Sequence, residues 1–125
     1  MSSNPQIPPI VQEQLAKLQQ TQQNFQSILM QKQQLESQKL ETEKALEELK
    51  KASDDEAVFK HAGTIMIKSN KKELLEELEE QMELAKTKAS LLAKQEERLK
   101  ATLQEQETKI QEMMKGPPTG TKSSK

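Results

Sequence analysis

Residues 75–113 read LEELEEQMELAKTKASLLAKQEERLKATLQEQETKIQEM. Apolar side chains recur in this stretch at alternating spacings of four and three residues, the heptad pattern of a helix that packs along one seam. The residues in this register are Leu75, Leu78, Met82, Ala85, Ala89, Leu92, Leu99, Leu103, Ile110 and Met113, and only Glu96 and Gln106 interrupt it. The pattern predicts a coiled-coil helix from about Lys71 to Lys115, with Asn70 as N-cap and Glu73 three residues on.

A second long helix is predicted upstream, from Pro9 or Ile10 to Lys51, because Pro fits the first helical turn and no Gly or Pro follows before Lys51. The apolar seam predicted for its first part consists of Val11, Leu15, Leu18, Phe25 and Leu29. Further along, the apolar positions move by one residue, to Ile28, Leu35, Leu46 and Leu49. We interpret this drift as a local change in supercoil, although a partner helix crossing at that level would leave the same pattern.

The residues between the two helices differ in composition. Residues 57–68, AVFKHAGTIMIK, combine β-branched and aromatic side chains around Gly63, which predicts two short strands within about 56–69. The helices are of nearly equal length, roughly 60–70 Å each, which favours antiparallel pairing. The predicted fold is therefore mainly α: an antiparallel two-helix coiled-coil hairpin with one short β-hairpin between the helices.

The predicted layout has a flexible N-terminal segment at 1–9, the coiled coil with its β-hairpin at 10–115, and a disordered tail at 116–125. Residues 116–123 of the tail loosely resemble a phosphate-binding loop. The spacing between its glycines is too short, however, and no predicted strand precedes it, so we expect no nucleotide site there.

Composition excludes several classes of function. With 32% hydrophobic residues, two Phe and no Trp or Tyr, the chain is poorly suited to enclose a catalytic pocket, and no nucleophile–base pair or metal-ligand cluster is found. The single His61 lacks a second ligand, and there is no cysteine. A net charge of −1 argues against nucleic-acid binding, and no apolar run suits a membrane span. We expect a soluble, cytoplasmic protein that is not an enzyme and that uses neither cofactor nor metal.

The predicted β-hairpin is a candidate oligomerisation surface. An isolated two-stranded hairpin is marginally stable in water, and its strand edges remain free to pair with other chains. The apolar residues that we expect to be covered by other subunits are Val58, Phe59, Ile65, Met66 and Ile67.

Three segments in this order resemble the β subunits of the prefoldin family: Ile7-Pro8-Pro9 ahead of a Gln-rich helix, residues 45–49 (ALEEL), and residues 58–68 (VFKHAGTIMIK). The resemblance covers residues 5 to about 115, with Phe59 where the family often has Tyr and Ala62 where a larger apolar residue is common. It implies a hexamer of two α and four β subunits, in which hairpins form a double β-barrel that carries six coiled coils. It further implies that non-native proteins are held at the coiled-coil tips without ATP and passed to a group II chaperonin.

Client binding is expected at the end of the helix pair where both termini lie, because a two-helix seam covers apolar side chains least where the helices end. The predicted client-binding residues, which we call the tip, are Ile10, Val11, Leu15, Ile110, Met113 and Met114. Packing in the seam is an equally good interpretation of Ile110 and Met113, whereas Met114 lies beside the seam.

Two alternatives remain open from the sequence. A structural coiled-coil scaffold or tether would use the same heptads without binding clients, although it would not need a strand-forming insertion. The acidic stretch from Glu73 to Glu83 could attract cations or a basic partner, although a solvated helix face that complements the helix dipole explains it better.

Overall fold

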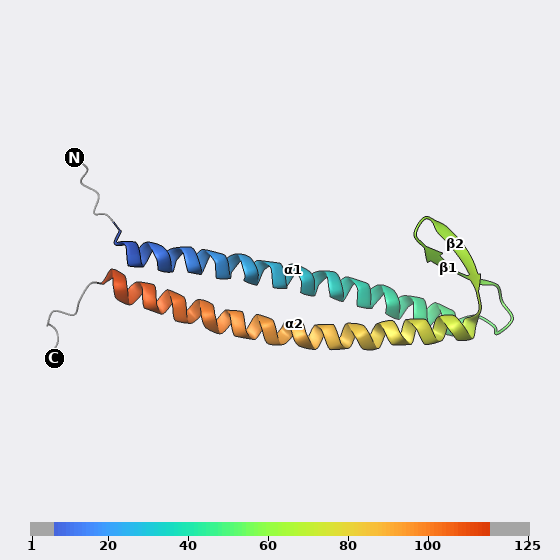
Figure 1. Ribbon diagram of the computed structural model, residues 1–125. Helices are drawn as coiled ribbons and strands as arrows, with labels where there is room; N and C mark the ends of the chain where they lie inside the picture. Colours follow the sequence, from blue (N-terminus) through green and yellow to red (C-terminus); the bar gives the residue numbers. More distant parts are fainter. Residues whose placement is uncertain (1–6, 116–125) are drawn as a thin grey trace. The chain divides into compact units, whose positions relative to one another are not determined.

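The computed structural model describes residues 7–115, and the expectations for residues 1–6 and 116–125 lie outside that range. Along the chain it contains α1 (Pro9–Lys51), β1 (Val58–Ala62), β2 (Ile65–Ser69) and α2 (Lys71–Met114) (Figure 1). Two long helices around a β-hairpin confirm the predicted fold class. In the described part of the chain, no helix is long and apolar enough to cross a membrane.

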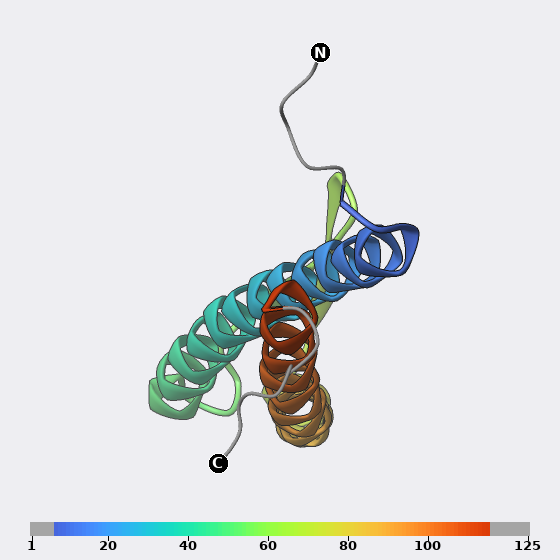
Figure 2. The ribbon, with the colours of Figure 1, turned by 90° about the vertical axis from the view of Figure 1, so that its left-hand side faces the viewer.

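The chain divides into two compact units, which we describe separately. Unit 1 comprises Met1–Leu29 and Lys94–Lys125, and unit 2 comprises Met30–Ala93. In unit 1, whose end faces the viewer in Figure 2, the first part of α1 lies beside the last part of α2. Ile28 and Leu99 line the same small hollow there. In unit 2, Leu35 and Ala85 line another, so the helix segments also adjoin in the unit that contains the hairpin.

Helix α1 begins as the proline pattern predicts. The Pro8 carbonyl accepts hydrogen bonds from the backbone N–H groups of Val11 and Gln12, both at 3.0 Å. The Gln12 side chain donates from Nε2 to the Ile7 carbonyl at 3.1 Å, and this bond holds Ile7, two residues before the helix, against its first turn. These bonds satisfy polar groups that every helix start leaves without an intrahelical partner.

The end of α1 is held by a side chain from the start of α2. Lys71 Nζ donates to the Ala52 carbonyl at 2.8 Å and to the Lys50 carbonyl at 3.4 Å, and it pairs with Asp54 at 3.4 Å. Asn70 Oδ1 accepts from the Glu73 backbone N–H at 2.9 Å, which confirms the predicted N-cap of α2. These bonds therefore stabilise the end of α1 and the beginning of α2, on either side of the hairpin.

The seam of α1 follows one heptad register along the whole helix. Its covered positions alternate by three and four residues: Val11, Gln14, Leu18, Thr21, Phe25, Ile28, Lys32, Leu35, Lys39, Thr42, Leu46 and Leu49. Leu29, next to Ile28, is also half-buried. The predicted displacement of the seam by one residue is therefore wrong. The apparent drift arose because Leu15 was placed in the seam, whereas it is 38% exposed and the polar Gln14 is buried in its place.

The seam of α2 agrees with the prediction. All ten predicted apolar positions are buried or half-buried, and Glu96 and Gln106 occupy seam positions of the same register as half-buried residues. Heptad spacing therefore continues through these polar residues. Gln106 Oε1 is buried and makes no hydrogen bond to the described part of the protein.

The β-hairpin pairs β1 and β2 antiparallel, from Val58 opposite Ser69 to Ala62 opposite Ile65. Two residues, Gly63 and Thr64, connect the strands. Gly63 has a φ of 67°, and no non-glycine residue of the described chain has a positive φ. A two-residue connection with glycine first is a favoured hairpin turn, because its twist matches that of the strands.

We expect Gly63→Ala to loosen the hairpin, because a side chain at this φ costs roughly 1–2 kcal/mol. No atom lies within 4 Å of an added Cβ, so the cost comes from the backbone alone. Amide hydrogen exchange in the two strands should accelerate by roughly five- to thirtyfold, while exchange in the helices stays unchanged. The matched Thr64→Ala variant should not differ from wild type, and equal effects of the two variants would contradict this account of the turn.

Candidate functional site

The β-hairpin exposes large apolar side chains on both faces. The strand register places Val58, Lys60, Ala62, Ile65, Ile67 and Ser69 on one face, which we call the aliphatic face. The opposite face carries Phe59, His61, Met66 and Lys68. Phe59, Ile65, Met66 and Ile67 are 51%, 58%, 60% and 41% exposed, and Val58 is half-buried. Four of the five predicted oligomerisation residues are thus freely accessible in the single chain.

The hairpin has no further strand to pair with in the described chain. Its sheet has two strands, so the outer edge of each presents backbone groups that are not part of a ladder. Such edges form ready templates for pairing with another chain. Exposed apolar faces and open edges therefore occur together on the same ten residues of strand.

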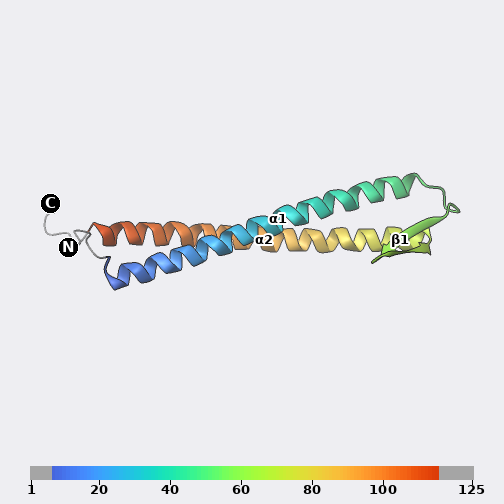
Figure 3. The same ribbon diagram turned by 90° about the horizontal axis from the view of Figure 1, so that it is seen from above.

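One ion pair connects the hairpin to α2. Lys60 Nζ lies 3.0 Å from Glu77 Oε2, and the two side chains are 40% and 44% exposed. An ion pair this exposed contributes at most about 1 kcal/mol. Because Lys60 belongs to the aliphatic face, the pair indicates that this face is turned toward the first turns of α2, over which the hairpin is seen in projection in Figure 3.

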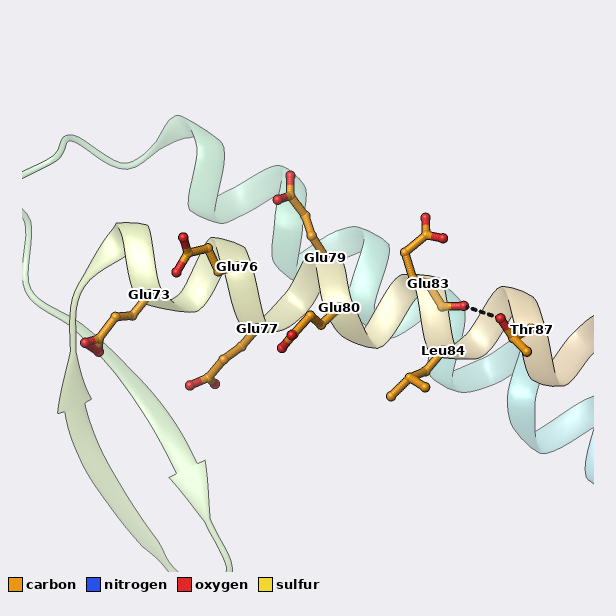
Figure 4. A pocket seen from close by; sticks show the side chains of 8 residues that line it. All are labelled: Glu73, Glu76, Glu77, Glu79, Glu80, Glu83, Leu84 and Thr87. Atoms are coloured by element: carbon orange, nitrogen blue, oxygen red, sulfur yellow. Dashed lines mark hydrogen bonds between the residues drawn. The ribbon is translucent and has the colours of Figure 1, made fainter.

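The acidic stretch lines an open hollow beside the hairpin (Figure 4). The lining residues are Glu73, Glu76, Glu77, Glu79, Glu80, Glu83, Leu84 and Thr87. Figure 4 shows that the carboxylates of the glutamates point outward on different sides of the helix rather than converging on one point. Glu77 pairs with Lys60, and Glu83 pairs with Lys86 at 3.6 Å. Within residues 7–115 no cluster of His, Cys, Asp or Glu could hold a metal ion.

The tip residues in unit 1 fall into two groups. Val11 is 2% exposed and Ile110 is 9% exposed, so both lie in the seam, where Met113 is half-buried. Ile10, Leu15 and Met114 are 57%, 38% and 60% exposed. Only the second group can meet another molecule without opening of the helix pair.

Ile7 is an exposed tip residue that sequence reasoning missed. It precedes the helix and was assigned to a flexible segment, but the Gln12 hydrogen bond holds its carbonyl against α1, and its side chain is 39% exposed. Two leucines of α2 were also overlooked: Leu84 and Leu91, seven residues apart in unit 2, are 63% and 56% exposed. Both lie outside the heptad register of α2, and a leucine outside the register is expected to be exposed, so the sequence pattern could have identified them.

Comparison with known proteins decides the family. The family model described as "Prefoldin subunit" matches residues 12–116. The chain belongs to the prefoldin family. A prefoldin subunit beta of Methanococcoides burtonii is 44% identical over 110 residues, covering 88% of this chain and 91% of the relative. One of Pyrococcus furiosus is 36% identical, covering 91% and 97%.

The prefoldin fold is shared in three dimensions as well. The crystal structure of the prefoldin beta subunit from Thermococcus strain KS-1 matches with a TM-score of 0.76 at 35% identity, covering 90% of this chain and 98% of that one. Membership of the prefoldin family makes this chain a chaperone-type subunit that assembles with other prefoldin subunits.

The two groups of tip residues should respond differently to mutation. We expect Val11→Ser to lower the free energy of unfolding by roughly 1.5–3 kcal/mol, because a buried apolar side chain is lost from the seam. The adjacent Ile10→Ser should change it by less than about 0.5 kcal/mol. Urea unfolding followed by circular dichroism measures both, and similar losses in the two variants would show that Ile10 is also part of the core.

Proposed function

We propose that this chain is the β-type subunit of a cytoplasmic prefoldin hexamer of two α and four β subunits. It holds non-native proteins at its tip without ATP and delivers them to a group II chaperonin. The observation that carries the proposal is the presence of two separate exposed apolar surfaces, one on strands with open edges and one at helix ends. The stoichiometry and the transfer to a chaperonin derive from the family resemblance.

The hairpin is suited to assembly because it combines apolar surface with unpaired backbone groups. Burial of apolar surface contributes roughly 25 cal/mol per Å², and strand pairing supplies direction and register. The aliphatic face, with Ile65 and Ile67 exposed two residues apart on one strand, can be covered when the hairpin becomes part of a larger β-structure. Continuation of β1 or β2 by strands of other subunits would satisfy the open edges at the same time.

Ile65→Lys combined with Ile67→Lys should release free subunits, because two buried charges would have to enter the assembled sheet. Native mass spectrometry should show loss of the hexamer, while circular dichroism shows that the helices persist. The matched control is Leu84→Lys with Leu91→Lys, which changes two equally exposed leucines on α2 and should leave the hexamer intact. A hexamer of wild-type mass in the hairpin variant would refute assembly through this surface.

The tip is suited to client binding because its exposed side chains are flexible or branched aliphatics at helix ends. Methionine, as at Met114, adapts its shape to varied apolar surfaces. Each buried side chain contributes roughly 1.5–3 kcal/mol at most, so a single tip binds weakly. Several tips on one hexamer raise the avidity by orders of magnitude through their effective concentration.

Replacing the three exposed tip residues by serine, Ile10→Ser, Leu15→Ser and Met114→Ser, should weaken client binding by roughly tenfold or more, since 1.4 kcal/mol already accounts for a factor of ten. The assay is suppression of aggregation of a chemically unfolded client, with hexamer mass and helical content as checks. Leu84→Ser with Leu91→Ser provides a control of similar exposure in unit 2. Undiminished suppression by the tip variant would refute client binding at this tip and favour binding along the inner helix faces or by the partner subunits.

A further inference from the structure

The first part of α1 contains two overlapping heptad series. The observed seam uses Val11, Gln14, Leu18, Thr21, Phe25 and Ile28. A second series replaces every other member by the next residue along the chain: Val11, Leu15, Leu18, Gln22, Phe25 and Leu29. Both series have heptad spacing, and they share three residues. The helix can therefore present either series to α2 after a roll of roughly 50°, half the angle between successive residues.

The observed packing is not the more apolar of the two. It buries Gln14 and Thr21, each 8% exposed, and leaves Leu15 38% exposed. Thr21 satisfies its hydroxyl by donating to the Lys17 carbonyl of its own helix at 3.0 Å. The facing segment of α2 adds a further polar residue, Gln106, whose buried Oε1 accepts no hydrogen bond from the described protein. Burying polar groups in place of an available leucine costs stability.

The rest of α1 explains why the observed series is used. Further along the helix, its seam positions include the buried Leu35 and Leu49. The second series would bring Glu36, Glu43 and Lys50 to the seam instead, all of them exposed charged residues. Because α1 is one continuous helix, the series that suits its second half is favoured in its first half. The two halves have conflicting local preferences, which is a form of frustration.

We propose that, within unit 1, α1 exchanges between two packings on α2, and that the observed one is the client-binding form. In the second packing Leu15, Gln22 and Leu29 replace Gln14, Thr21 and Ile28 in the seam, and Leu15 is withdrawn from the surface. Gln14 is then a positioning residue: its place in the seam holds Leu15 outside, where a non-native polypeptide can contact it. This inference rests on client binding at the tip, as proposed above.

Exchanging two neighbouring residues tests the role of Gln14 without changing composition or charge. The variant Gln14→Leu with Leu15→Gln replaces the buried glutamine of the observed seam by leucine and removes the exposed leucine. In the full-length chain assembled with its partner subunits, the melting temperature should rise by roughly 4–8 °C. Suppression of client aggregation should fall at least threefold. A variant that is more stable but still suppresses aggregation like wild type, or one that is no more stable, would overturn the proposal.

The matched control is Thr21→Gln with Gln22→Thr, which exchanges two polar residues at the equivalent step of the next heptad. It leaves Leu15 exposed, so suppression of client aggregation should remain within about 1.5-fold of wild type. A change of this size corresponds to far less than the roughly 1.4 kcal/mol of binding free energy that a tenfold change in affinity requires. A loss as large as that of the Gln14 and Leu15 exchange would mean that any seam change impairs the tip, which would also overturn the proposal.

Cysteine cross-linking tests the two packings directly, because the chain contains no cysteine. Ile28 shares a hollow with Gln95 and Leu99, so one heptad nearer the tip Thr21 lies level with 102–106, where Leu103 is a seam residue. Oxidation should join both Thr21→Cys with Leu103→Cys and Gln22→Cys with Leu103→Cys. A bond only in the first pair would show a single packing and contradict the exchange. Cross-linking needs no client and therefore tests the two packings alone. The serine variant of the tip tests client binding separately.

Discussion

Heptad packing between α1 and α2 is the constraint on which the other features of this prefoldin subunit depend. A seam of two helices covers one narrow stripe of each, and even the best covered apolar residue outside Val11 retains 8–9% exposure. Such a seam has little room for a globular core. Apolar residues that do not fit the stripe must therefore remain on the surface or be covered by another molecule. They include residues of the hairpin and the tip as well as Met30, Leu40, Leu84 and Leu91 along the helices.

The two exposed surfaces differ in the type of contact that they can make. The hairpin offers backbone groups along open strand edges, which require a partner of defined register, as another subunit of an assembly provides. The tip offers side chains on helix ends, with no free edge to impose register. Our proposal of a fixed partner for the hairpin and varied, weakly bound partners for the tip rests on this difference in backbone rather than on composition, since both surfaces contain exposed isoleucine and methionine.

Residue type predicted the helix limits, the Asn70 cap and the two strands, because each depends on local chemistry: proline at a helix start, an amide at an N-cap, glycine in a two-residue turn. The seam of α2 was also predictable, since its apolar residues fit one register. The α1 seam was not, because Leu15 fits the local apolar pattern better than Gln14, and the choice between them is made by residues further along the helix. Among the tip residues, the sequence placed Val11 and Ile110 in the seams and Met114 beside one, in agreement with their burial, and Leu15 was the residue placed wrongly.

The central claim is that non-native proteins bind at the end of unit 1 while the hairpin is reserved for assembly. Hydrogen–deuterium exchange of the assembled hexamer, with and without a bound unfolded client, measures both surfaces in one experiment. The account predicts that the client slows exchange in the first turns of α1 and the last turns of α2 and leaves β1 and β2 unchanged. Client-dependent protection of the β-hairpin, with none at the helix ends, would contradict it.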